Sequence, residues 1–241
     1  MYAHYSTVTA SMSDETGRLS LTSAMCLLQD TSQLWLDSEP ELKKYFEENN
    51  MAQVLAARQM DIIRMPEYGT RVKTVTRVYL CRGFSGQRNT FIYDADDESI
   101  IYVKSIGFGA FIDLSAGSLK RIPREIAQKV VIDEKLDMEY LPPKIAAPES
   151  EPVIFDSITA GRCDIDFNRH VNNVQYIRMA YELLPRDTEY GRLRVEYRLP
   201  AKLDDIIIPY VFMEDGRVVV DLKNEDGASY ALAEFSNGKQ R

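Results

Sequence analysis

Alternation of apolar and polar residues is the main pattern of this chain. It occurs in segments rich in Val, Ile, Tyr and Phe, at residues 70–80, 88–93, 100–111, 192–198, 206–213, 217–222 and 230–235. Turn-forming clusters at residues 94–98, 214–216 and 224–227 follow such segments and are typical of hairpins. Because alternation is the pattern of a half-buried strand, the sequence predicts antiparallel strands in each half of the chain.

Two segments have helical spacing instead. The first covers about residues 22–36 and presents Leu21, Met25, Leu28 and Trp35 on one stripe. In the second, Asn172 is a good N-cap and Gln175 completes a variant of the capping box. Its predicted apolar face consists of Val174, Ile177, Ala180, Tyr181 and Leu184. A shorter helix is predicted to begin at Pro123.

The candidate chemistry lies directly before the second helix, in the sequence DFNRHVNN. Asp166 can accept a proton or orient a water molecule, Asn168 can donate to an oxygen, and His170 can do either. The helix start adds unpaired N–H groups of Val171, Asn172 and Asn173, which can hold the oxygen of a polarised carbonyl. These residue types indicate acyl transfer or hydrolysis. The alternative is an ordinary turn and cap with no chemistry.

A weak internal repeat relates the two halves. Residues 8–10 (Val-Thr-Ala) match residues 158–160 (Ile-Thr-Ala), and Asp14 then matches Asp164. Residues 64–72 similarly resemble residues 198–206. In this register Thr16, Arg18 and Ser20 correspond to Asp166, Asn168 and His170, so we expect a single site, in the second half.

The repeat also defines the predicted domains. We expect an N-terminal domain at residues 1–128, a linker at 129–150, and a C-terminal domain at 151–241. The linker contains Pro142-Pro143 and a second stretch rich in Ala, Pro and Glu, as connectors often do.

Composition narrows the class of protein. The 241 residues are 45% hydrophobic and 27% charged, which is typical of a globular protein, and the net charge of −8 argues against nucleic acid as a partner. Three unrelated cysteines favour a reducing compartment. The sequence shows neither a signal peptide nor a membrane span. We therefore expect a cytoplasmic protein.

These features resemble the acyl-ACP thioesterases of bacteria and plants. DFNRHVNNVQYI is similar to the family pattern D-x-N-x-H-V-N-N-x-x-Y, and the first half is less specifically similar at residues 17–21, 27–30 and 64–66 and at Arg88. The resemblance implies an α+β fold, a tandem (double) hotdog of two antiparallel β-sheets, each wrapped around a long α-helix. It also implies hydrolysis of fatty acyl groups on the phosphopantetheine arm of acyl carrier protein, in fatty acid biosynthesis.

One departure from the family affects the mechanism. Plant members read E-Y-R-R-E-C in the strand after the helix, whereas this chain reads EYRLPA at residues 196–201. Pro200 and Ala201 therefore stand where the family has a catalytic Glu and a Cys. The segment YRLPAKLDD resembles the corresponding strand of single-hotdog acyl-CoA thioesterases, in which a loop Asp is the principal carboxylate. The resemblance thus makes Asp166 the chief candidate.

Our hypothesis is that Asp166 activates water or attacks directly, while Asn168 and His170 position the reactants. The sequence leaves open whether His170 is a general base or an orienting group. No metal or cofactor is expected, because a thiolate is already a good leaving group. Three other functions remain open: an acyl-CoA thioesterase, a non-catalytic module that binds acyl chains or acyl carrier protein, and a hydroxyacyl dehydratase. A homodimer also remains open.

Several other residues have side chains that could be functional. We expect Cys163 to be a small buried residue, His4 to have no catalytic task, and Asp30 to be solvated. The resemblance implies that the first half holds the acyl chain, so Met25, Met51, Met60 and Met65 are either its lining or ordinary core. A second set could meet the carrier protein or be a solvated surface: Arg162, Arg169, Arg178, Arg192, Arg194 and Arg198.

Overall fold

The chain divides between Leu141 and Pro142 into two units, Met1–Leu141 and Pro142–Arg241. The structure is a computed structural model and describes residues 1–186 and 188–238. The division falls inside the segment predicted as a linker. Each unit consists of an antiparallel sheet and the helices that pack on it, as expected for an α+β fold.

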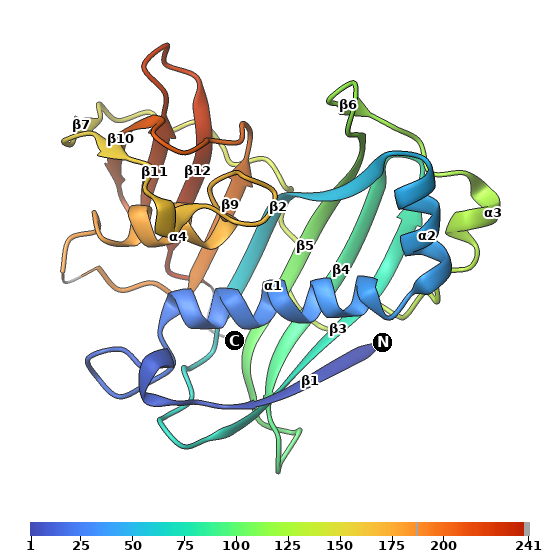
Figure 1. The fold of residues 1–241 in the computed structure, drawn as a ribbon. Coiled ribbons are helices and arrows are strands. Elements are labelled where there is room, and N and C mark those ends of the chain that lie inside the picture. The colour runs from blue at the N-terminus through green and yellow to red at the C-terminus, as the bar shows by residue number, and fades with distance from the viewer. Residues whose placement is uncertain (187, 239–241) are drawn as a thin grey trace. The chain divides into compact units, whose positions relative to one another are not determined.

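The N-terminal unit has its strands in the order β1-β3-β4-β5-β2, with the short β6 paired to β5 (Figure 1). All pairs are antiparallel. The strand bounds are β1 Tyr2–Thr7, β2 Met51–Ile62, β3 Arg71–Arg82, β4 Ser85–Asp94, β5 Ile101–Asp113 and β6 Ser118–Leu119. The predicted strands at 70–80, 88–93 and 100–111 are confirmed by β3, β4 and β5.

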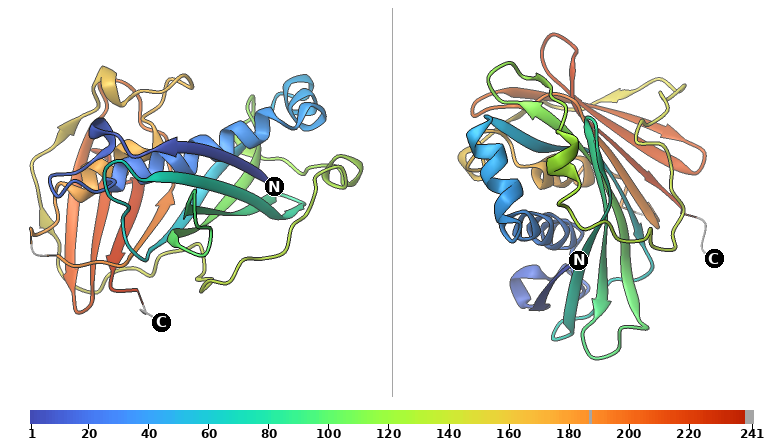
Figure 2. Two further views of the ribbon diagram at one scale, coloured as in Figure 1. Left: turned by 90° about the horizontal axis from the view of Figure 1, so that it is seen from below. Right: turned by 90° about the vertical axis from the view of Figure 1, so that its right-hand side faces the viewer.

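Helix α1 (Leu21–Asp37) packs against β1, β3 and β4 and lies along one face of this sheet (Figures 1 and 2). The predicted stripe is buried at Leu21, Met25, Leu28 and Trp35. Ser20 caps the helix by accepting a hydrogen bond from the Ser23 N–H. The other helical segments of the unit are η1 Ala10–Met12, α2 Pro40–Glu48 and α3 Arg124–Ala127.

The C-terminal unit repeats this plan with shorter elements. Its strands follow the order β9-β12-β11-β10-β7, and β8 pairs with β10 (Figure 1). The strand bounds are β7 Val153–Ile154, β8 Ile158–Thr159, β9 Arg192–Tyr197, β10 Ile206–Glu214, β11 Arg217–Lys223 and β12 Ser229–Ser236. Helix α4 (Asn173–Tyr181) packs against β11 and β12, and η2 (Arg162–Asp164) precedes it. All four strands predicted in this half are confirmed.

Some sequence predictions were incomplete or wrong. Strand β2 was missed because buried Arg58 and Gln59 interrupt its apolar pattern, and the short α2 was also missed. The second helix is shorter than predicted, since α4 ends at Tyr181, which is 42% exposed, and Leu184 lies beyond its end. In the first half, Met25, Met51 and Met60 are buried residues of the core.

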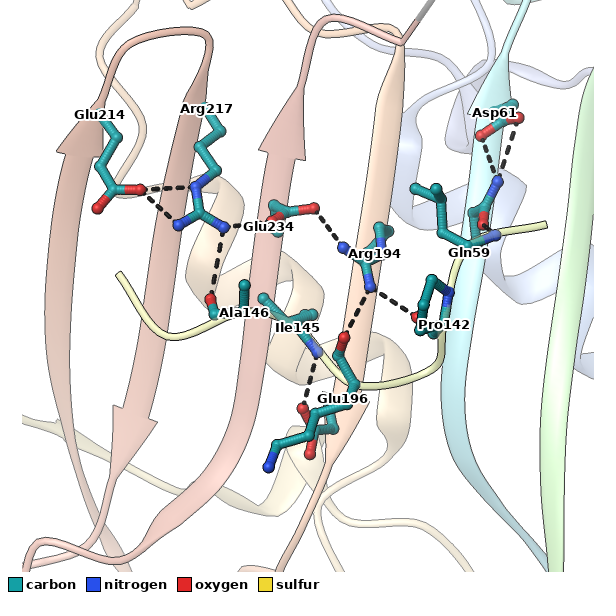
Figure 3. Close-up of polar contacts among 12 residues, drawn as sticks. Gln59, Asp61, Pro142, Ile145, Ala146, Arg194, Glu196, Glu214, Arg217 and Glu234 are labelled. Carbon is teal, nitrogen blue, oxygen red and sulfur yellow. Dashed lines mark hydrogen bonds and ion pairs between the residues drawn. The ribbon is translucent and has the colours of Figure 1, made fainter. Parts of the chain in front are cut away.

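The segment at residues 142–146, predicted as part of a loose linker, is anchored to the C-terminal sheet. Arg194 on β9 and Arg217 on β11 both pair with Glu234 on β12, at 2.9 and 2.8 Å. Arg194 also donates to the Pro142 carbonyl at 2.7 Å (Figure 3). Ile145 packs on the same sheet, and its N–H donates to Glu196. Ion pairs as buried as these are costly to break, so this part of the chain is fixed.

The end of the N-terminal unit is fixed in a comparable way. Gln59 on β2 donates to the Glu139 carbonyl at 2.7 Å and accepts from the Leu141 N–H at 3.1 Å. This accounts for the burial of a polar side chain in β2.

Within residues 1–186 and 188–238, every helix is too short or too polar to span a bilayer.

Candidate active site

The sequence DFNRHVNN forms a narrow loop that leads into α4. The Asp166 N–H donates to the His170 carbonyl at 2.9 Å, and the Arg169 N–H donates to the Asp166 carbonyl at 2.9 Å. Arg169 has φ of 63°, in the left-handed region that usually favours glycine. Asn172 caps the helix as predicted, because its side chain accepts from the Val174 N–H at 2.9 Å.

The loop brings the side chains of Asp166 and Asn168 together. Oδ1 of Asp166 accepts from the Asn168 N–H at 2.8 Å, and Oδ2 lies 3.4 Å from Nδ2 of Asn168. Asp166 is half-buried, whereas Asn168 is exposed. Because only one of these contacts is short, Oδ2 retains capacity to accept a proton or to orient water.

His170 contributes to the loop through its backbone. Its carbonyl accepts from the Asp166 N–H, while its imidazole is half-buried and makes no hydrogen bond to any residue in the described part of the chain. The structure therefore joins two of the three predicted side chains, and the ring nitrogens of the third remain available to a substrate or water.

The structure corrects the predicted set of oxyanion donors. The Val171 N–H donates to the Ala201 carbonyl at 2.8 Å, and the Asn172 N–H donates to the Asp164 carbonyl at 2.8 Å. Both groups hold the loop in place and cannot also face a ligand. The Asn173 N–H has no hydrogen-bond acceptor among the described residues, so it is the remaining candidate of the three.

The predicted capping box is also wrong. Oε1 of Gln175 accepts from Nε of Arg178 at 2.7 Å instead of reaching back to Asn172. Arg178 in turn pairs with Asp164 at 2.8 Å, and the other oxygen of Asp164 accepts from the Gly161 N–H. The ion pair between Arg178 and Asp164 thus ties α4 to η2.

Two residues that support the loop were not identified from the sequence as functional. The Tyr176 hydroxyl accepts from the Ala201 N–H at 2.8 Å, and the Ala201 carbonyl holds the Val171 N–H. Burial raises the pKa of Tyr176 to about 12, so the hydroxyl stays neutral near pH 7. The signal missed was a tyrosine on the buried face of the predicted helix, where its hydroxyl requires a partner.

Phe167 is the most exposed large apolar side chain of the protein, at 84%. It lies between Asp166 and Asn168, at the tip of the loop. Its ring is therefore accessible to a ligand or a partner.

The hydrogen bonds give the correct register of the internal repeat. The Asp14 N–H donates to the Arg18 carbonyl, the Gly17 N–H donates to the Asp14 carbonyl, and Gly17 has φ of 75°. These bonds match those of Asp166, His170 and Arg169, so Asp14 corresponds to Asp166 and Ser20 to Asn172. The predicted register was two residues off. The true counterparts of Asp166, Asn168 and His170 are Asp14, Thr16 and Arg18, and the first copy keeps its aspartate.

The rival candidates have mixed outcomes. Cys163 is exposed, so the prediction that it is buried is wrong. Asp30 is exposed, as expected, although partial burial raises its pKa above the ordinary value and the charge of His4 opposes this. His4 lies in β1.

Most of the arginines near the motif already have partners. Arg178, Arg194 and Arg198 pair with Asp164, Glu234 and Glu196. Arg192 is buried. Arg162 and Arg169 are exposed and remain available to a ligand. Among the described residues, no cluster of His, Cys, Asp and Glu side chains could hold a metal ion.

Comparison with known proteins shows the same architecture elsewhere. An acyl-ACP thioesterase from Bacteroides thetaiotaomicron superposes with a TM-score of 0.85 at 20% identity, covering 97% of this chain and 96% of that chain. A 12:0-ACP thioesterase from Umbellularia californica gives a TM-score of 0.84 at 16% identity, covering 98% and 96%. The fold is therefore the tandem hotdog implied by the motif.

Sequence comparison adds the family. A chloroplastic acyl-[acyl-carrier-protein] hydrolase from Cuphea viscosissima is 25% identical over 198 residues, which is 74% of this chain and 47% of the plant protein. The chain thus spans about half the length of this relative. Family models match both halves, the acyl-ACP thioesterase N-terminal domain at residues 1–130 and the C-terminal domain at residues 149–234. The chain belongs to the acyl-ACP thioesterase family.

Proposed function

We propose that this protein hydrolyses fatty acyl thioesters carried by acyl carrier protein, with Asp166 as the principal catalytic carboxylate. One observation carries the proposal: in a chain that matches the family along both halves, Asp166 is half-buried in the loop before α4, where the Asn168 N–H donates to one of its oxygens. A carboxylate in this setting can act as a base towards water or as a nucleophile.

In the proposed reaction, Asp166 accepts a proton from a water molecule as the water oxygen adds to the thioester carbonyl. The carbon–sulfur bond then breaks, the fatty acid is released, and the thiolate takes up a proton. In the alternative route, the carboxylate adds to the carbonyl, the carbon–sulfur bond breaks and the thiolate leaves and takes up a proton. Water then hydrolyses the resulting mixed anhydride, which releases the fatty acid and restores the carboxylate. Both routes place negative charge on the carbonyl oxygen, and the Asn173 N–H is the donor available to it at the helix start.

Asn168 and His170 are proposed to position the reactants. The Asn168 side chain lies beside Oδ2 of Asp166 and can donate to water or to the thioester oxygen. The His170 imidazole can orient water or share its proton. Pro200 cannot act as a base, so the carboxylate that plant members place there is not part of this proposal.

The carrier is proposed on three grounds. Both family models are named for acyl-ACP, exposed Arg162 precedes the loop and exposed Arg169 lies within it, and Phe167 between them in sequence offers an apolar surface. An acidic carrier would gain from the arginines, and raised salt should then weaken binding. We propose that the N-terminal unit receives the acyl chain.

The decisive experiment is thiol release from matched series of acyl-ACP and acyl-CoA substrates with chains of increasing length. Hydrolysis that is faster with acyl-ACP supports the full proposal, and hydrolysis that is faster with acyl-CoA would assign the protein to CoA thioesters. Tight binding of acyl-ACP without thiol release would contradict the catalytic role. Appearance of an enoyl product from a hydroxyacyl substrate would indicate a dehydratase instead.

A further inference from the structure

A cavity of about 770 Å³ opens in the N-terminal unit between the β3–β4 turn and α3. Its lining comes from residues 81–83 and from eight of the residues between Arg121 and Ile132. None of these residues belongs to the Asp166 loop. The volume falls within the range of about 300–1,000 Å³ that is usual for small-molecule sites.

The floor of the cavity is apolar. Ile122, Ala127 and Val130 line it and are 2%, 8% and 4% exposed. All three belong to a buried cluster that also contains Trp35. The lining further includes Ile132, which is 50% exposed. Ile132, together with the small exposed area of the floor, therefore offers apolar surface that a hydrocarbon chain could cover, which favours binding.

Three arginines give the same cavity a positive charge. Arg82, Arg121 and Arg124 line it and are exposed, and none has a carboxylate within ion-pair distance among the described residues. The guanidinium of Arg121 lies 5.0 Å from the ring centre of Phe84. By contrast, the exposed Arg71 of the same unit pairs with Asp96 at 2.9 Å.

Neighbouring charges do not cancel this group. Lys129 is paired with Glu41, and Asp133 is paired with the N-terminal amino group of Met1. Glu125 lies on α3 but does not line the cavity. Cys81 lines it as a neutral thiol, because burial raises its pKa to about 11. In a protein with a net charge of −8, an unpaired cluster of arginines favours an anionic ligand.

We propose that this cavity binds a single-chain amphiphile with an anionic head group, its hydrocarbon chain on the Ile122, Ala127 and Val130 floor and its head group on the three arginines. A fatty acid anion has this chemistry. The identity of the natural ligand as the enzyme's own product rests on the proposed function, whereas the site itself does not. Binding here would give the protein a second contact with its product, apart from the Asp166 loop.

The chain carries its own reporter for this site. Trp35 is its only tryptophan and lies in the cluster beneath the cavity floor. We expect saturable one-to-one quenching or enhancement of its fluorescence when dodecanoate is added below its micelle concentration. Dodecyl phosphate tests a phosphate head group, dodecanol tests the chain without charge, and inorganic phosphate tests the charge without a chain.

The matched variants remove two positive charges each. Arg121→Ala with Arg124→Ala should raise the dissociation constant for dodecanoate by about tenfold, since charge-assisted contacts are lost. The control, Lys44→Ala with Arg71→Ala, removes exposed cations that pair with Glu48 and Asp96 in the same unit and should leave it unchanged. Circular dichroism of both variants checks that they fold, and all the substituted side chains are exposed.

Equal dodecanoate affinity in the two double variants would overturn the proposal, as would equally tight binding of dodecanol. Preference for dodecyl phosphate over dodecanoate would keep the site and assign it to a phosphate head group. Thiol release is measured in parallel. Dodecanoate binding without thioesterase activity would leave the site intact and refute the proposed function, and activity without binding would do the reverse.

Discussion

The loops before α1 and α4 share a pattern of backbone hydrogen bonds, but their aspartates differ in how many donors they bind. In the first, one oxygen of Asp14 accepts from the Thr16 N–H, the Thr16 hydroxyl and the Arg18 N–H, at 2.8, 2.7 and 3.2 Å. In the second, the corresponding oxygen of Asp166 has one backbone donor among the described residues, Asn168. The same aspartate thus serves the turn in one copy and is left available in the other.

The pKa of Asp14 is consistent with a structural role. Partial burial works against its ionisation, but the hydrogen bonds from Thr16 and Arg18 outweigh burial and lower the pKa below its ordinary value of 3.8. A carboxylate stabilised in this way is a weak base. An aspartate in this turn is therefore not by itself a sign of catalysis. The neighbouring residues determine whether its carboxylate is occupied by hydrogen bonds of the turn or is available to a substrate.

Two left-handed positions reinforce the difference. The first copy uses Gly17 and Gly69, with φ of 75° and 83°, whereas the second uses Arg169 and Asp204, with φ of 63° and 69°. The hydrogen bonds of the neighbouring turns show that these residues correspond. Non-glycine residues in the left-handed backbone region are common at functional sites, where the strained backbone is part of the site's function.

The largest predicted effect comes from substituting the two aspartates in parallel. Asp166→Asn should lower kcat by about 100-fold or more, because the amide cannot accept the proton. Asp14→Asn should change kcat by less than about twofold, since Asp14 serves only its own turn. Steady-state thiol release measures both. Equal losses in the two variants would contradict the assignment of one catalytic loop.

Substitutions of His170 test whether its imidazole is a general base or an orienting group. His170→Ala should lower kcat/KM by about tenfold, whether the imidazole is a base or an orienting group. His170→Asn separates these, because an amide can hydrogen-bond to substrate but cannot transfer a proton. Recovery of most of the activity in His170→Asn identifies an orienting group, and no recovery identifies a base. The control is Arg18→Ala, at the matched position of the first loop, which should leave the rate unchanged.

Gly17 and Arg169 occupy matched left-handed positions, so substitutions at the two positions should change the free energy of unfolding in opposite directions. Gly17→Ala should destabilise by about 1 kcal/mol, because a side chain disfavours the left-handed backbone even with nothing within 4 Å of its Cβ. Arg169→Gly should stabilise by a similar amount, about 1 kcal/mol, while lowering activity if Arg169 meets the carrier. Urea unfolding measures both. Destabilisation by Arg169→Gly would show that the arginine makes contacts that outweigh the strain.

The smallest effect is in the pH dependence of stability. Because the folded pKa of Asp14 is lowered, its contribution is present above the ordinary value of 3.8 and is lost as the pH falls through the folded pKa. The stability difference between the parent protein and Asp14→Asn should therefore shrink below about pH 4. A difference that does not change between neutral and acidic pH would mean that Asp14 does not gain from its donors.

The comparison also shows what the sequence could predict. Alternation identified seven of the strands because each has one buried face, and the spacing of Leu21, Met25, Leu28 and Trp35 identified α1. Strand β2 escaped because Arg58 and Gln59 are buried in it, with partners on β5 and in the later segment that ends the unit. Such partners are distant in sequence and leave no local pattern.

The site was predicted in part for the same reason. Asp166, Asn168 and Asn172 form local contacts, which their spacing encodes. The N–H groups of Val171 and Asn172 donate to the carbonyls of Ala201 and Asp164. These contacts form only in the folded chain, so the sequence could not show that both N–H groups already have acceptors. The register of the repeat was wrong because the similarity of residues 8–10 to residues 158–160, with two identities in three positions, was given more weight than the turn geometry. The turn hydrogen bonds place Asp14 opposite Asp166.

The most direct test of the account is a single-turnover experiment on Asp166→Asn, with enzyme in excess over acyl-ACP. If Asp166 acts in the chemical step, acyl-ACP binds as to the parent protein and the rate of thiol release falls by about 100-fold or more. An unchanged single-turnover rate with folded protein would contradict the central claim that this carboxylate, and not its counterpart Asp14, performs the hydrolysis.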